Sequence, residues 1–153
     1  MTERRQMGLK RTAIDVPEWT DFVYPVHIES RHINDAGHMA FTTVPELLDR
    51  TRRAWFDHLG LDEQHLDGVG VIVADLQVIY CSEGHEGETL AVAMSVADVS
   101  QRSCQIIYRL TERSSGREVA RARTALVFFD YTRKQPAHMP DCVRSKLECD
   151  GAI

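Results

Sequence analysis

Residues 30–60 read SRHINDAGHMAFTTVPELLDRTRRAWFDHLG and join a polar loop to the most strongly amphipathic helical pattern of the chain. Apolar residues recur there at three- and four-residue steps, which is the spacing of one helix face. They are Val44, Leu47, Leu48, Trp55 and Leu59, with Thr51 on the same face. Thr43 and Glu46 have the spacing of a capping box, and Gly60 suits the far end. The pattern predicts a helix over residues 44–59.

The loop before this helix places polar groups beside the first helical turn, where unpaired backbone N–H groups attract negative charge. Asn34, Asp35, Gly37 and His38 lie in it. Gly37 permits a close approach of the backbone, and the N–H groups of Gly37 and His38 could polarise a carbonyl oxygen. The alternatives are a tight turn that needs glycine only for its geometry, an Asx turn at Asn34 and a histidine bonded to backbone.

The length of 153 residues indicates one domain with a core of its own. The formal net charge of −5 argues against nucleic acid or an anionic membrane as the partner, because such partners usually require a basic patch. No apolar run approaches the roughly 20 residues that a membrane-spanning helix needs. We therefore expect no nucleic-acid partner and no membrane partner.

The four cysteines show no CxxC spacing, and a chain of this size does not depend on disulfides. We interpret Cys81, Cys104, Cys142 and Cys149 as reduced thiols and expect a cytoplasmic location without a metal site. Residues 1–20 are expected to form a flexible N-terminal arm, residues 21–140 the folded domain, and residues 141–153 a C-terminal tail.

Alternating apolar residues predict strands over residues 22–29, 71–80, 90–99, 103–111 and 118–131. The order is therefore one strand, the helix, and then four strands joined by hairpin-sized connections. The economical arrangement is an α+β fold in which an antiparallel sheet wraps around one long helix. One sheet edge and one flank of the helix stay uncovered in that arrangement, so we expect a homodimer or a homotetramer.

This order of elements resembles the hotdog fold, and within it the 4-hydroxybenzoyl-CoA thioesterase-like branch of the acyl-CoA thioesterases. Many relatives carry an Asp-x-Asp-x-x-Gly-His-(Val/Met) signature before the helix, and residues 32–39 read HINDAGHM here. Residues 48–56 resemble the family's helix segment, and residues 122–130 its last strand. The resemblance implies hydrolysis of an acyl-CoA thioester, with coenzyme A as part of the substrate and no cofactor.

The chain departs from the family signature at the position of the usual catalytic acid. Asn34 stands there, and an amide cannot act as a base near neutral pH. Asparagine variants resemble the plant acyl-carrier thioesterases, in which an asparagine and a histidine belong to the site. The resemblance therefore implies catalytic roles for Asn34, Gly37 and His38, and it leaves Asp49 on the helix and Asp35 beside Asn34 as candidates for the missing carboxylate.

Five further residues are candidates for substrate binding. His32 occupies the first acidic position of the signature and is expected to support the site. Phe41 and Tyr80 are candidates for the lining of an acyl pocket, and ordinary core positions are the alternative for both. Arg121 and Arg123 share one face of a strand and are expected to meet the phosphates of coenzyme A, although solvated strand charges are the alternative.

Two other functions stay open on the sequence. The absence of the usual acid at Asn34 would suit a protein that binds acyl-CoA without hydrolysing it. An enoyl-thioester hydratase is the second alternative, although such enzymes usually pair an aspartate with a histidine in a different segment.

Overall fold

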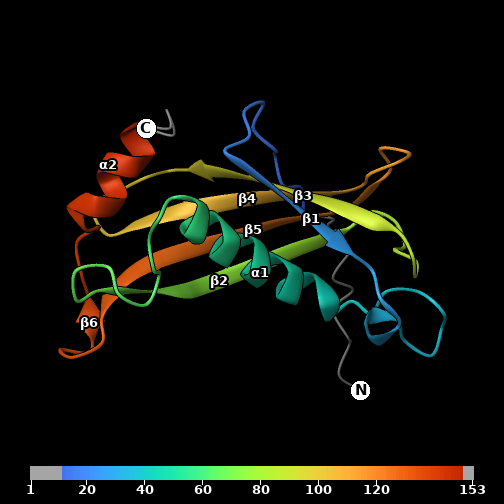
Figure 1. Cartoon of the computed structure of the whole chain (residues 1–153), viewed down its shortest axis with the longest axis horizontal. Coiled ribbons are helices and arrows are strands. Elements are labelled where there is room, and N and C mark those ends of the chain that lie inside the picture. Colours follow the sequence, from blue (N-terminus) through green and yellow to red (C-terminus); the bar gives the residue numbers. More distant parts are fainter. Residues whose placement is uncertain (1–11, 150–153) are drawn as a thin grey trace, which may run out of the picture.

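The computed structural model describes residues 12–149, and its architecture is one antiparallel sheet packed against one long helix (Figure 1). The elements follow in the order β1 (Phe22–His27), η1 (Ser30–His32), α1 (Thr43–His58), β2 (Gly70–Tyr80), β3 (Thr89–Ala97), β4 (Ser103–Glu112), β5 (Glu118–Asp130), β6 (Gln135–Pro136) and α2 (Asp141–Cys149). The expected order of one strand, one helix and four strands is confirmed, with β6 and α2 added after it.

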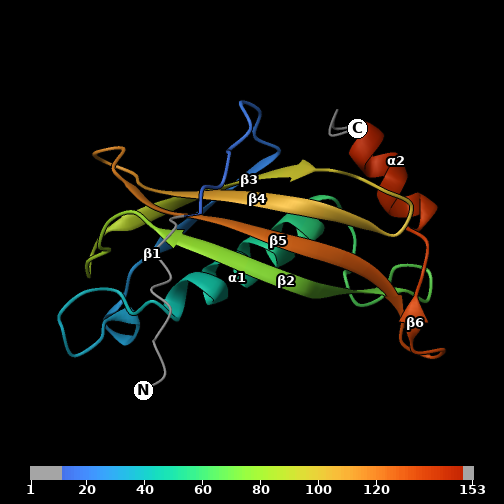
Figure 2. The same ribbon diagram turned by 180° about the vertical axis from the view of Figure 1, so that it is seen from behind.

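The sheet has the strand order β1-β3-β4-β5-β2, and every pairing in it is antiparallel. Figure 2 shows the sheet from behind, with α1 lying across its far side. β2 follows α1 in the chain but forms the edge beside β5. The short strand β6 pairs with the end of β5. Among the described strands, β1 and β2 are therefore the two edges.

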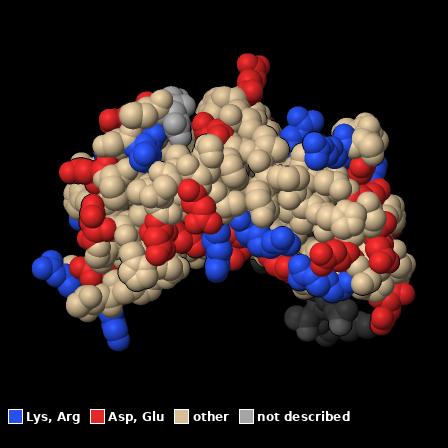
Figure 3. All heavy atoms as spheres, viewed as in Figure 1, with Lys and Arg blue, Asp and Glu red and all other residues tan. Residues whose placement is uncertain are grey.

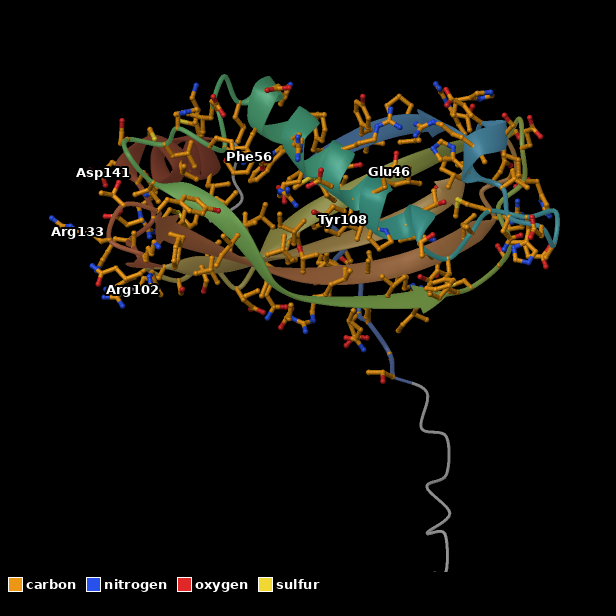
Figure 4. All side chains as sticks on the ribbon, turned by 90° about the horizontal axis from the view of Figure 1, so that it is seen from below. Glu46, Phe56, Arg102, Tyr108, Arg133 and Asp141 are labelled. Atoms are coloured by element: carbon orange, nitrogen blue, oxygen red, sulfur yellow. The ribbon has the colours of Figure 1, made fainter. Side chains whose placement is uncertain are left out.

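The core lies between α1 and the sheet because alternate strand residues point toward the helix. Tyr108 of β4 is fully buried and projects into this space (Figure 4). Val44, Leu47 and Phe56 of α1 are equally buried against it. The apolar stripe that predicts the helix is therefore the face that packs on the sheet.

The C-terminal end of α1 is as expected, whereas its N-terminal end differs from the expected capping box. Gly60 has a φ of 72° and follows the C-cap Leu59, as expected for a glycine that ends a helix. The capping box at Thr43 and Glu46 does not form, because Thr43 is already inside the helix and its N-cap is Thr42. The Thr43 hydroxyl instead donates to the carbonyl of His32 at 3.4 Å.

The segment after residue 140 differs from the expected tail. Asp141–Cys149 form α2, and its Val143 and Leu147 are buried in the main core. These two residues are four apart, so they share one helix face, and that short pattern is too brief to stand out in the sequence. The last residues of the expected tail, 150–153, lie outside the described residues.

The described part of the N-terminal arm lies on the face of the sheet opposite α1 (Figure 4). Ile14 is buried, and its carbonyl accepts a hydrogen bond from Arg121 at 3.1 Å. The carbonyl of Trp19 accepts one from Ser95 at 2.6 Å. Residues 1–11 of the expected arm lie outside the described residues.

Within residues 12–149, neither helix is both long enough and apolar enough to cross a membrane. Acidic and basic side chains alternate over the helix-bearing face, and no extended area of one sign covers the described residues drawn there (Figure 3).

Candidate active site

A pocket of about 300 Å³ lies between the loop that precedes α1 and the turn that follows β2. Its lining is mostly apolar, with a few polar groups converging on it, as in typical small-molecule sites. Residues from the first segment are Asn34, His38, Met39 and Phe41, and residues from the second are Tyr80, Cys81, Ser82, Glu83 and Gly84. The pocket therefore contains four of the expected site residues: Asn34, His38, Phe41 and Tyr80.

Larger and more polar depressions also occur. One of about 750 Å³ is lined by the turn before β3 and the turn after β4, and two others lie on the face of the sheet opposite α1. One of about 400 Å³ lies between the N-terminal arm and the sheet, and one of about 420 Å³ lies beside it. We place the site in the smaller pocket because the expected residues converge there.

Hydrogen bonds within the loop explain its shape. The N–H of Gly37 donates to the carbonyl of Asn34 at 3.0 Å, and the N–H of Asn34 donates to the carbonyl of His38 at 3.0 Å. Gly37 has a φ of 85°, a conformation that favours glycine. The Gly37 N–H is therefore engaged inside the turn, which differs from the expectation that it points toward a substrate oxygen.

Two hydrogen-bond donors of this loop have no acceptor among the described residues. The side-chain oxygen of Asn34 accepts the N–H of Ala36 at 3.0 Å, so Asn34 does form an Asx turn. Its amide nitrogen makes no hydrogen bond to any described residue, and neither does the backbone N–H of His38. The loop thus offers an amide N–H₂ and a backbone N–H beside the pocket.

The ring of His38 has one nitrogen fixed by the backbone. Its Nδ1 lies 3.2 Å from the carbonyl of Met39. Because a carbonyl only accepts hydrogen bonds, Nδ1 carries the proton and Nε2 of the neutral ring keeps a lone pair. The side chain is one-third exposed, and Nε2 lies 4.0 Å from the Glu83 carboxylate.

Glu83 is a site residue that the sequence did not indicate. It belongs to the polar turn after β2, whose composition predicts only a loop. The turn reaches the pocket because the Met39 N–H donates to the carbonyl of Gly84 at 2.8 Å. No local pattern could have shown this contact, since it depends on the position of β2 at the sheet edge.

Arg117 fixes the turn that carries Glu83. Its guanidinium donates to the Ser82 hydroxyl at 2.9 Å, to the Glu83 carbonyl, and to the Glu88 carboxylate at 2.6 Å. A planar guanidinium holds several acceptors in fixed directions, so three points of the turn are set by one side chain.

Tyr80 and Phe41 form the apolar mouth of the pocket. The Tyr80 hydroxyl donates to the Phe41 carbonyl at 2.8 Å, and partial burial raises the pKa of the Tyr80 phenol, which therefore stays protonated. The Phe41 side chain is 71% exposed. Both rings are thus placed to meet an apolar ligand.

His32 lies behind the loop and outside the pocket lining. Its ring is buried, and its Nδ1 accepts the N–H of Glu29 at 3.0 Å. Its carbonyl accepts the N–H of Ala40 at 2.9 Å. His32 therefore holds the two ends of the loop together from outside the pocket.

The other candidate carboxylates lie outside this pocket. Asp35 is exposed at the tip of the turn. Asp49 is on α1, where its carboxylate pairs with Arg52 at 2.5 Å and with Arg53 at 2.9 Å. Neither of them lines the pocket, so the structure does not bring them together with His38.

Arg121 and Arg123 share one sheet face, as expected, but this is the face opposite α1. Arg123 pairs with Asp75 at 3.3 Å, and Arg121 pairs with Glu118 at 2.6 Å. Arg121 lines the depression of about 420 Å³, which shares Tyr80 and Cys81 with the pocket. The two arginines are therefore separated from the pocket by the edge strand β2.

The thiols and acids form no metal centre in the described part of the chain, where no group of three or more histidine, cysteine, aspartate or glutamate side chains could hold an ion. Cys104 is buried, which raises the pKa of its thiol to about 12 and keeps it protonated.

The sequence profile of a family described as the Thioesterase-like superfamily matches residues 16–147. No curated protein sequence matches the chain.

Solved structures with the same fold include several thioesterases. A 1,4-dihydroxy-2-naphthoyl-CoA thioesterase from Synechocystis has a TM-score of 0.78 and 18% identity, over 84% of this chain and 96% of that one. A Staphylococcus aureus protein solved in complex with CoA has a TM-score of 0.79 and 13% identity, over 90% of this chain and 87% of that one. At these identities the likeness shows the fold alone, and it confirms the expected hotdog architecture.

Proposed function

The chain belongs to the thioesterase-like superfamily, a family of thioester hydrolases, and we propose that its substrate is an acyl-CoA, which it cleaves to the free acid and coenzyme A. The observation that carries this proposal is the convergence of Asn34 and His38 on one apolar pocket, each with an unused hydrogen-bond donor. We assign the chain to the 4-hydroxybenzoyl-CoA thioesterase-like branch on the loop over residues 32–39.

In the proposed mechanism, the thioester oxygen binds to the side-chain N–H₂ of Asn34 and the backbone N–H of His38. Negative charge develops on this oxygen as the carbonyl carbon becomes tetrahedral. Preformed donors stabilise that charge more than they stabilise the neutral carbonyl, and this difference lowers the barrier. Gly37 contributes by shaping the turn that presents both donors.

His38 is the proposed site of proton transfer. Its Nε2 carries a lone pair because Nδ1–H is bonded to the Met39 carbonyl. An imidazole nitrogen with a lone pair can take a proton from water and later return it to the departing thiolate. Tyr80 and Phe41 would contact the acyl group at the mouth of the pocket.

We also propose that the protein works as a homodimer joined through β2, alone or as a pair of dimers. This strand is a sheet edge, and its Val73, Leu76 and Tyr80 side chains are 43%, 44% and 43% exposed. An apolar edge strand is usually covered by another chain. Because Tyr80 belongs to both the edge and the pocket, a second subunit would complete the acyl site. No disulfide joins two of the described cysteines, which suits a reducing compartment such as the cytoplasm.

The test is release of free thiol from short, branched, aromatic and long acyl-CoAs by the purified protein. Asn34→Ala should lower kcat by about 100- to 1,000-fold, which is the usual effect of losing one oxyanion donor. Asp35→Asn is the matched control, since Asp35 lies outside the pocket, and it should keep the wild-type rate. Absence of turnover with every acyl class would overturn the proposal, and coenzyme A binding without hydrolysis would favour a non-catalytic acyl-CoA-binding protein.

A further inference from the structure

We propose that Glu83 supplies the carboxylate that Asn34 lacks, and that Glu83 and His38 together hold and deprotonate the hydrolytic water. This inference rests on the proposed thioesterase function and adds a catalytic residue from a different segment of the chain. Glu83 lies in the turn after β2, far in sequence from the loop over residues 34–38.

The gap between the two groups fits one water molecule. Glu83 Oε1 and His38 Nε2 are 4.0 Å apart, which is too long for a direct hydrogen bond. A water oxygen about 2.8 Å from each atom spans this distance. Nε2 and a carboxylate oxygen both accept, so such a water donates one hydrogen to each of them. Its lone pairs are then directed away from both groups and are free to attack a carbonyl carbon.

Glu83 is positioned by its neighbours. Its other carboxylate oxygen lies 3.2 Å from Nε2 of His85, while Arg117 holds its backbone carbonyl. The adjacent Gly84 carbonyl accepts the N–H of Met39, the residue next to His38. Met39 follows His38 and Gly84 follows Glu83, so this hydrogen bond keeps the Glu83 side chain opposite His38.

No other carboxylate of the described residues lines this pocket. Asp49 forms ion pairs with two arginines of α1, and Asp35 lies at the exposed tip of the turn. Among the described residues, Glu83 is therefore the one acid that lines the pocket together with Asn34 and His38.

The reaction balances with water as the second substrate. The water oxygen forms a bond to the carbonyl carbon while one proton passes to the Glu83–His38 pair, and the carbonyl oxygen becomes an oxyanion held by Asn34 and the His38 N–H. The carbon–sulfur bond then breaks with its electron pair on sulfur. The stored proton passes to the departing thiolate, which leaves a carboxylic acid and the thiol of coenzyme A.

The test compares Glu83→Gln with Glu86→Gln in steady-state thiol release. Glutamine keeps the size and hydrogen-bonding ability of glutamate but is no base, so Glu83→Gln should lower kcat by about 100- to 10,000-fold, as for loss of a general base. KM and the Kd for coenzyme A should stay close to wild type. Glu86 is an exposed acid of the same turn and outside this pocket, so Glu86→Gln should be fully active.

A second measurement separates a base from a structural residue. Hydroxylamine attacks thioesters without help from a base, so added hydroxylamine should restore enzyme-dependent product formation, as hydroxamate, in Glu83→Gln above the enzyme-free rate. An active wild type with an equally active Glu83→Gln would overturn the role of Glu83 and leave the thioesterase function standing. Loss of activity without hydroxylamine rescue would assign Glu83 to structure and also overturn the proposal. A wild type without hydrolysis would overturn both proposals.

Discussion

Replacing Arg52 with methionine would leave the carboxylate of Glu63 buried without its main counter-ion. Arg52 and Glu63 are only 8% and 6% exposed, although both are charged. Arg52 Nε lies 2.9 Å from Glu63 Oε2, and Nη2 lies 3.5 Å from Oε1. Arg52 also reaches Asp49 at 2.5 Å, so one cation serves two acids on the flank of α1.

The expected loss of stability follows from this geometry. Removing one partner of a buried ion pair typically costs about 3–5 kcal/mol. Arg53 stays 3.6 Å from Glu63 and compensates in part, so we expect Arg52→Met to cost about 3 kcal/mol, near the lower end of that range. For a chain of this size, this corresponds to a Tm lower by roughly 6–12 °C.

The double variant Arg52→Met/Glu63→Leu should recover most of that loss, because replacing both charges with apolar groups removes the cost of burying an unpaired charge. Urea denaturation measures the free energy of unfolding of the wild type, the single variant and the double variant. The protein concentration is kept fixed, because oligomer formation would otherwise change the midpoint. Arg53→Met is the control, because its side chain is 62% exposed and exposed pairs are worth about 0–1 kcal/mol. A cost below about 1 kcal/mol for Arg52→Met, or a double variant no more stable than the single one, would refute this reasoning.

Three further outcomes are expected. Hydrogen bonds from Ser115 and Ser114 lower the pKa of Glu112 to about 2, so this carboxylate stabilises the fold above its unfolded pKa of about 4.3, and that contribution is lost as the pH falls toward 2. Glu112→Gln should therefore lower Tm at pH 7 but not near pH 2; an equal deficit at both pH values would contradict this assignment. Leu76→Lys should convert dimers into folded monomers in sedimentation experiments, while dimers that persist would place the interface elsewhere. Gly84→Val should cost about 1–3 kcal/mol and lower kcat, because a Cβ at Gly84 would lie 3.2 Å from the Met39 Cβ; unchanged turnover would separate this contact from the site.

The sequence predicts the regular elements well, because their patterns are local. The stripe over residues 44–59 and the alternation in five strands depend on neighbours along the chain, and the structure confirms both. The start of α1 and the helix α2 are less predictable. Thr43 bonds to His32 across the loop, and α2 is fixed by burial of Val143 and Leu147 in the distant core. These are tertiary effects that override local propensity.

The same distinction between local patterns and tertiary contacts applies to the residues of the candidate site. Asn34 and His38 lie in a loop whose polar composition already indicates a site, Phe41 and Tyr80 are candidates for an acyl pocket, and all four line the pocket. Glu83 has no such signal, because it enters the pocket only through the pairing of β2 with β5. Alternation correctly places Arg121 and Arg123 on one face, but it cannot say which face meets α1, since both faces carry alternate residues of the same strand.

The hydrogen bond between Met39 and Gly84 limits which changes in length the loop before α1 and the turn after β2 can accept. Each partner adjoins a proposed catalytic residue, so a single inserted or deleted residue in either turn would separate His38 from Glu83 while the sheet stayed intact. New substrate preferences should therefore arise by replacement of Phe41 and Tyr80 within a fixed frame, which makes these two positions the natural starting point for a designed change of acyl group.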